Sequence, residues 1–130
     1  MIHCQGWISA VAPLYIKTAF KDEPSFDGTK VVFEINDVKL KNNLPENFNS
    51  CLATRNVTKT FLKKENLKFE NADDLLKLGI KFSDALILGT NEPNKEVVDY
   101  AESEGKPVLP FVENPDYASY YGDFYEKLLS

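Results

Sequence analysis

Short apolar runs separated by longer amphipathic segments dominate the hydrophobic pattern of the chain. The runs cover residues 1–4, 31–35, 85–88 and 108–112, and β-branched residues are frequent in the second and fourth. Continuous apolar strands without alternation are typical of a parallel sheet covered by helices. The pattern therefore predicts an α/β fold with a parallel sheet of about four strands.

Helical periodicity fills the segments between these runs. It predicts a helix after the first strand, with Ser9 as its N-cap and Pro13 in its early turns. Another helix is expected to start at Asn71, and a third to carry Pro93 in its first turn. The last segment, 117–129, has an aromatic face that is expected to dock on the sheet.

Residues 36–70 show the least regular pattern, and we expect short helices and loops there. The chain has 130 residues, of which 43% are hydrophobic. That length supports one compact core and is too short for two. Residues 1–130 are therefore expected to form a single domain.

The charge balance and the apolar stretches exclude several classes of protein. With 20 acidic and 15 basic residues, the net charge of -5 disfavours nucleic-acid binding. The apolar stretches are far shorter than the roughly 20 residues of a membrane span. The first residues lack the pattern of a secretory signal, so we expect no membrane association, a cytoplasmic location and reduced thiols.

Motifs for metal, phosphate and hydrolytic chemistry are missing from the sequence. His3, Cys4 and Cys51 fall short of the four ligands that a zinc site uses, and His3 is expected to be a hydrogen-bonded structural residue. Neither a glycine-rich phosphate loop nor a Gly-x-Ser-x-Gly turn is present. We therefore expect no metal and no cofactor.

Polar residues follow the predicted strands at their carboxyl ends, where α/β folds bind their ligands. Gln5 and Asn36 come from adjacent strand ends, and their amides can bond sugar hydroxyls. Trp7 and Asp37 lie beside them in sequence. The alternatives are that the amides only cap loops and that Trp7 packs in the core.

Three sequence blocks carry a resemblance to a known family. Residues 2–7 and 13–17 resemble a strand ending in His-x-His/Asn-Asp-Trp and a helix containing Leu-x-Pro-x-Tyr-Leu. Residues 30–37 are similar to a Lys-x-Val-Phe-Thr-Val-His-Asn strand, and 78–90 to a segment in which Ala-Asp-x-Ile/Val precedes Val-Ser. The family is that of bacterial glycogen (starch) synthases, and the short glycogen-synthase-like proteins of Bacteroides-type bacteria are the most similar.

The resemblance implies a fold and an activity. The chain would be the second, Rossmann-like half of the N-terminal domain of a GT-B glycosyltransferase. Such enzymes transfer glucose from ADP-glucose to an α-1,4-glucan with retention and without a metal. The family's Lys-Thr-Gly-Gly loop would precede Met1 and its second domain would follow Ser130, so we expect the chain to be inactive alone.

Two matched positions depart from the family's pattern. Gly6 stands where the family has Asp, and Asn36 stands where it has the active-site His. Asn cannot titrate near neutrality as His does. We therefore assign no catalytic residue and expect Gln5, Trp7, Asn36 and Asp37 to bind substrate.

Two other classes of function stay open. The chain could be a non-catalytic domain for glycan binding, nucleotide binding or protein association. A flavodoxin-like or receiver-like module is less favoured, because the first strand lacks an acidic cluster at its end.

The resemblance also implies that helices cover mainly one face of the sheet. Parallel sheets seldom leave a face bare. We therefore expect self-association through the uncovered face, exchange of a segment, or closure of the gap by residues 36–70 or the last helix.

Overall fold

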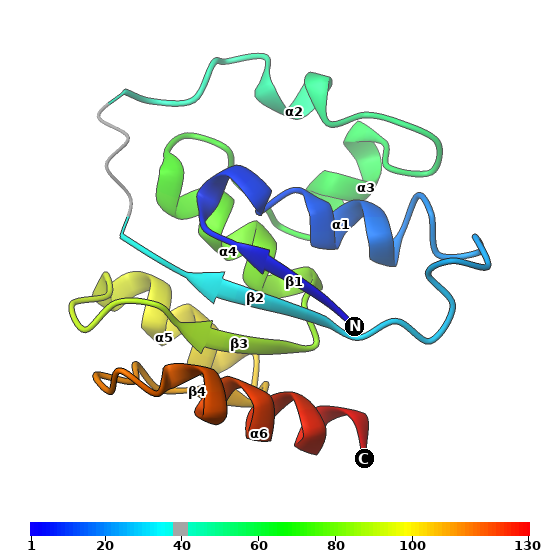
Figure 1. Cartoon of the computed structure of the whole chain (residues 1–130). Helices are drawn as coiled ribbons and strands as arrows, with labels where there is room; N and C mark the ends of the chain where they lie inside the picture. Colours follow the sequence, from blue (N-terminus) through cyan, green and yellow to red (C-terminus); the bar gives the residue numbers. More distant parts are fainter. Residues whose placement is uncertain (38–41) are drawn as a thin grey trace.

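The computed structural model describes residues 1–37 and 42–130 and contains one four-stranded sheet (Figure 1). All neighbouring strands are parallel, in the order β1 (Ile2–Gln5), β2 (Val31–Ile35), β3 (Ala85–Leu88) and β4 (Val108–Leu109). This confirms the predicted α/β fold with a parallel sheet. The fourth strand is shorter than the predicted 108–112, and Pro110, which has no N–H to donate, follows its last residue.

The register of the strands sorts their side chains between the two faces of the sheet. Cys4 pairs with Phe33, and Phe33 pairs with Leu86. These side chains belong to the main core, whereas Val32 and Glu34 face the other side. Every residue of β2 is buried, as expected for a central parallel strand.

Three helices cover the first face of the sheet: α1 (Ala12–Lys17), α4 (Ala72–Phe82) and α5 (Lys95–Ser103). Asn71 begins α4 as predicted, in a capping box with Asp74. Asn94 caps α5, so this helix starts after Pro93 and the predicted first-turn position of Pro93 is wrong.

The predicted N-cap of the first helix is also wrong. Ser9 ends a short 3-10 helix, η1 (Trp7–Ser9), and its hydroxyl donates to the carbonyls of Gln5 and Gly6. The α1 helix begins at Ala12, with Pro13 in its first turn as predicted. The hydroxyl of Ser9 thus donates hydrogen bonds to carbonyls at the end of β1 and does not cap a helix.

An outer layer packs on α1 and α4 (Figure 1). It contains α2 (Phe48–Cys51) and α3 (Lys59–Lys64), the short helices expected within 36–70. Leu52 and Leu62 contribute to a second core cluster together with Leu14 and Leu78 of the inner helices. Residues 38–41 of the predicted stretch lie outside the described residues.

The second face of the sheet is covered by α6 (Tyr117–Leu129). Its aromatic side packs on Val32, Ala85 and Ile87, as the sequence predicted for this helix. The last helix therefore closes the face that was expected to be bare. Although α6 covers this face, none of its own residues is fully buried.

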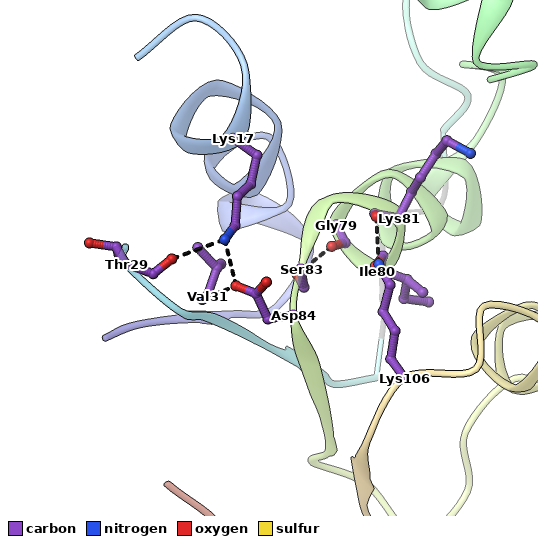
Figure 2. Close-up of polar contacts among 9 residues, drawn as sticks. All are labelled: Lys17, Thr29, Val31, Gly79, Ile80, Lys81, Ser83, Asp84 and Lys106. Carbon is purple, nitrogen blue, oxygen red and sulfur yellow. Dashed lines mark hydrogen bonds and ion pairs between the residues drawn. The ribbon is translucent and has the colours of Figure 1, made fainter. Parts of the chain in front are cut away.

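A polar network holds the amino edge of the sheet to the helices on the first face (Figure 2). The Oδ2 atom of Asp84 accepts from the backbone N–H of Val31 at 2.7 Å and pairs with Nζ of Lys17 at 2.6 Å. Lys17 also donates to the carbonyl of Thr29 at 2.9 Å. Asp84 thus ties α1 to the start of β2.

Lys106, just before β4, binds the carboxyl end of α4 (Figure 2). Its ammonium group donates to the carbonyl of Ile80 at 2.6 Å and to that of Lys81. A cation at this place compensates the negative end of the helix dipole. Burial lowers the pKa of Lys106.

Replacing Gly79 of α4 tests the packing of the helix on β2. A Cβ atom at position 79 would lie 2.7 Å from ring atoms of the buried Phe33. We expect Gly79→Ala to lower the free energy of unfolding by about 1–3 kcal/mol, measured by urea denaturation.

Gly122→Ala in α6 is the matched control, because an added Cβ there meets nothing within 4 Å. This substitution is expected to be neutral or stabilising by up to about 1 kcal/mol. Equal stabilities of the two variants would contradict the close approach of α4 to β2.

Candidate functional site

A pocket of about 380 Å³ lies at the carboxyl edge of the sheet, beyond the end of β2. We call it the carboxyl-edge pocket. Its walls come from the end of β2, the first turns of α4 and the segment before α5, through Ile35, Asn36, Asp37, Asp73, Leu76, Glu92, Pro93 and Asn94. Strand ends and helix N-termini therefore meet at one place, as α/β folds arrange their ligand sites.

The lining of this pocket is acidic and rich in amides. Asp73 lies in the first turn of α4 and accepts from Nδ2 of Asn94 at 2.9 Å. Asp37 and Glu92 add two further carboxylates. Carboxylates and amides bind hydroxyl groups well, whereas the negative charge opposes a phosphate. The pocket suits a neutral, hydroxyl-rich ligand.

Glycines on both neighbouring strand ends make room for Asn36. Nδ2 of Asn36 would lie 3.8 Å from a Cβ added at Gly6. A Cβ at Gly89 would lie 1.8 Å from Oδ1 of Asn36, so a side chain there would require Asn36 to move. The amide of Asn36 is thus held between the ends of β1 and β3.

Glu34 is a buried carboxylate on the face of β2 that α6 covers. Its oxygens lie 3.0 Å from Nε2 of His3 and accept from Nε2 of Gln5 at 3.0 Å. Nδ1 of His3 lies 2.7 Å from the hydroxyl of Tyr125 on α6. We call Glu34, His3, Gln5, Tyr121 and Tyr125 the Glu34 network.

Opposing effects set the pKa of Glu34. Burial pushes the pKa of this carboxyl upward, but hydrogen bonds from His3, Gln5 and Asn36 and the attraction of His3 favour the ionised form. The balance lowers the pKa of Glu34 below its ordinary value. Glu34 is therefore a charged acceptor at neutral pH.

Burial and the negative charge of Glu34 raise the pKa values of two tyrosines of α6. Burial, followed by the negative charge of Glu34, raises the pKa of Tyr121 to about 12. The same causes raise the pKa of Tyr125. Both hydroxyls stay protonated at neutral pH, so neither is an activated nucleophile. The Glu34 network attaches α6 to the sheet.

Comparison with known proteins identifies the family. The family described as starch synthase catalytic domain matches residues 1–125. The chain belongs to this family. The assignment confirms the resemblance that the sequence blocks carry. No solved structure matches the chain.

Curated relatives of the starch synthase family match part of the chain. The glycogen synthase of Desulforudis audaxviator is 29% identical over 86 residues, which is 66% of this chain and 17% of the relative. The glycogen synthase of Moorella thermoacetica is 27% identical over 84 residues, or 65% and 17% of the two chains. That of Thermotoga maritima is 28% identical over 86 residues, or 66% and 17%. The matched part thus spans 17% of the length of each of these relatives.

The structure separates the binding residues expected from the starch synthase motifs. Asn36 and Asp37 line the carboxyl-edge pocket. Gln5 approaches Asn36 through their shared partner Glu34 but does not line the pocket. Trp7 is half-buried against the main core, which favours its packing role over a sugar platform. The expectation that His3 is structural agrees with its bonds to Glu34 and Tyr125.

Other polar residues of the site were not predicted from the sequence. The sequence patterns assign no binding role to Asp73 or Glu92, which lie near the predicted helix starts at Asn71 and Pro93. No role was predicted for Asn94 or Glu34. A charged residue inside an apolar strand, such as Glu34, is nevertheless a usable signal of a buried polar network. The pocket therefore contains more carboxylates than the sequence analysis anticipated.

Neither a cluster of metal ligands nor a membrane-spanning helix is found among the described residues. Within residues 1–37 and 42–130, no group of three His, Cys, Asp or Glu side chains is arranged to hold a metal ion. No helix in the same part of the chain is long and apolar enough to cross a membrane.

The lowered pKa of Glu34 predicts a pH-dependent contribution to stability. Because the folded pKa is below the unfolded one, the contribution is present above the ordinary pKa of 4.5 and is lost as the pH falls through the folded value. We expect Glu34→Gln to lower the free energy of unfolding at pH 7 by about 1–3 kcal/mol. It should also flatten the loss of stability on acidification.

Glu126→Gln on the exposed side of α6 is the control and should retain the wild-type pH dependence. Urea denaturation at several pH values measures both variants. An unchanged acid profile of Glu34→Gln would contradict the proposed charge state of this carboxyl.

Proposed function

We propose that the chain is one partial domain, residues 1–130, of a cytoplasmic GT-B glycosyltransferase that transfers glucose from ADP-glucose to an α-1,4-glucan. The starch synthase family and the glycogen synthases that match most of this chain support the reaction class. ADP-glucose as donor rests on the resemblance of the motifs, and the cytoplasmic location is the expectation from the sequence. The role of this chain in that reaction depends on its carboxyl-edge pocket.

The lining of the carboxyl-edge pocket is the observation that supports glucan binding. Asn36 and Asp37 directly follow β2, at the place where the family's motif has its polar pair. The neighbouring carboxylates Asp73 and Glu92 add acceptors for hydroxyl groups. ADP-glucose carries a negatively charged diphosphate, so this pocket favours the neutral glucan over the donor. The chain therefore contributes to binding the acceptor.

We propose no catalytic role for the described residues of the pocket. Asn36 occupies the position of the family's active-site His and cannot take up or release a proton near neutrality. Asp73 already accepts a hydrogen bond from Nδ2 of Asn94, and Asp37 is exposed. We therefore propose that the chain alone does not transfer glucose.

Titration with ligands tests the glucan proposal. Maltopentaose should shift the backbone amide signals of Asn36, Asp37 and Asp73 in nitrogen-15 NMR spectra, whereas ADP-glucose should leave them unchanged. Asp37→Ala should weaken maltopentaose binding about three- to tenfold, because one exposed hydrogen-bonding group is lost. Asp27→Ala, at an exposed position that does not line this pocket, is the matched control.

Two results would refute parts of this proposal. ADP-glucose shifting the pocket amides as strongly as maltopentaose would remove the argument from charge. Transfer of labelled glucose from ADP-glucose to glycogen by the purified chain would show that the chain is active alone.

We also propose that the chain self-associates, through the outer edge of β1. The face that was expected to drive association is covered by α6. Within the described residues β1 pairs only with β2, so its other edge is open to a strand from a second copy. Ile8, in the short η1 helix that follows β1, is 77% exposed and is available to such a contact. A protein-association role thus has its own structural support.

Light scattering over a range of concentrations tests self-association. The average mass should rise with concentration, and Ile8→Lys should suppress the rise by placing charge beside the open edge. Leu129→Lys, at a residue of α6 that is 63% exposed, should leave the rise unchanged. A strictly monomeric wild-type chain would refute this proposal.

A further inference from the structure

A second pocket, of about 250 Å³, lies at the amino edge of the sheet, opposite the carboxyl-edge pocket. We call it the amino-edge pocket. Lys17, Lys21 and Lys30 contribute three of its lining side chains, and Ile16 and Phe26 add an apolar wall. No acidic residue of the described chain lines it. In a chain with a net charge of -5, this is a local concentration of positive charge.

The three lysines differ in how far their charge is compensated. Lys17 is bound to Asp84 at 2.6 Å and to the carbonyl of Thr29 at 2.9 Å, as Figure 2 shows. Lys21 and Lys30 form no ion pair within the described part of the chain. Two uncompensated ammonium groups therefore border one small pocket.

The acidic residues near the amino-edge pocket do not line it. Glu23, in the same connection, forms an ion pair with Arg55 at 3.1 Å. Asp22 and Asp27 are exposed and do not line the pocket. Other lysines add to the field, because Lys106 senses the repulsion of Lys17 across the amino edge. An anion in the pocket would relieve repulsion among these ammonium groups.

We propose that the amino-edge pocket binds a phosphate monoester of a small organic molecule. Lysine ammonium groups bind phosphate as point charges, and Lys21 and Lys30 are available to do so. Phe26 and Ile16 offer an apolar surface to the organic part. This site lies at the sheet edge opposite the proposed glucan site, so its ligand does not compete with the glucan.

Nitrogen-15 NMR titrations at low ionic strength test the proposal with glucose 1-phosphate, inorganic phosphate and glucose as probes. Glucose 1-phosphate should shift the amide signals of residues 28–30 and bind more tightly than inorganic phosphate. Glucose should leave these signals unchanged. Added salt should weaken the binding of both phosphates, because it screens exposed charges.

The double variant Lys21→Gln/Lys30→Gln should bind glucose 1-phosphate about tenfold more weakly. Lys17 is left intact because its ion pair with Asp84 stabilises the fold. The matched control, Lys63→Gln/Lys64→Gln, removes two exposed lysines from α3, outside this pocket, and should retain wild-type affinity. Circular dichroism confirms that both double variants are folded before they are compared.

Three results would overturn the proposal. The first is equal affinity of the wild type and Lys21→Gln/Lys30→Gln, and the second is equal weakening by the control variant. The third is binding of inorganic phosphate as tight as that of glucose 1-phosphate, which would exclude a role for the apolar wall. Failure of maltopentaose to bind elsewhere would not affect these readouts.

Discussion

The need to bury both faces of a parallel sheet governs the whole structure. β2 is buried at every residue, so each neighbouring element has to supply cover on one side or the other. Three helices cover one face and α6 alone covers the other. The polar strand ends are consequently pushed to the rim, which places Asn36 and Asp37 beside the starts of α4 and α5. The pocket is a by-product of how the sheet is covered.

A charge inside the sheet makes the cover on the second face specific. Glu34 would be costly to bury without partners, and His3, Gln5 and the tyrosines of α6 supply them. The bond between His3 and Tyr125 adds a directional contact to the apolar packing of α6. The sheet and the last helix are thus matched by polar chemistry as well as by shape.

Local patterns in the sequence predicted the strands and helices better than the contacts between segments far apart in the chain. The apolar runs placed all four strands, and Asn71 placed the start of α4, because these signals depend on adjacent residues. The shared pocket of Asp37, Asp73 and Glu92 depends on contacts between segments far apart in the chain. An acid in the first turn of a helix and an acid that lines a pocket look alike in sequence, so the pattern around Asn71 does not reveal the role of Asp73. Position 34 shows the same limit, since its partners come from β1 and α6.

The space around Asn36 has a consequence for substitutions. Its amide fills the volume that a side chain at position 89 would need, so the two positions cannot vary independently. A larger residue at 89 would require residue 36 to be shortened or reoriented. A larger side chain at 36 would have to fit into the same space, between Gly89 and the carboxylate of Glu34. Substitutions at positions 36 and 89 are therefore coupled and have to be designed together.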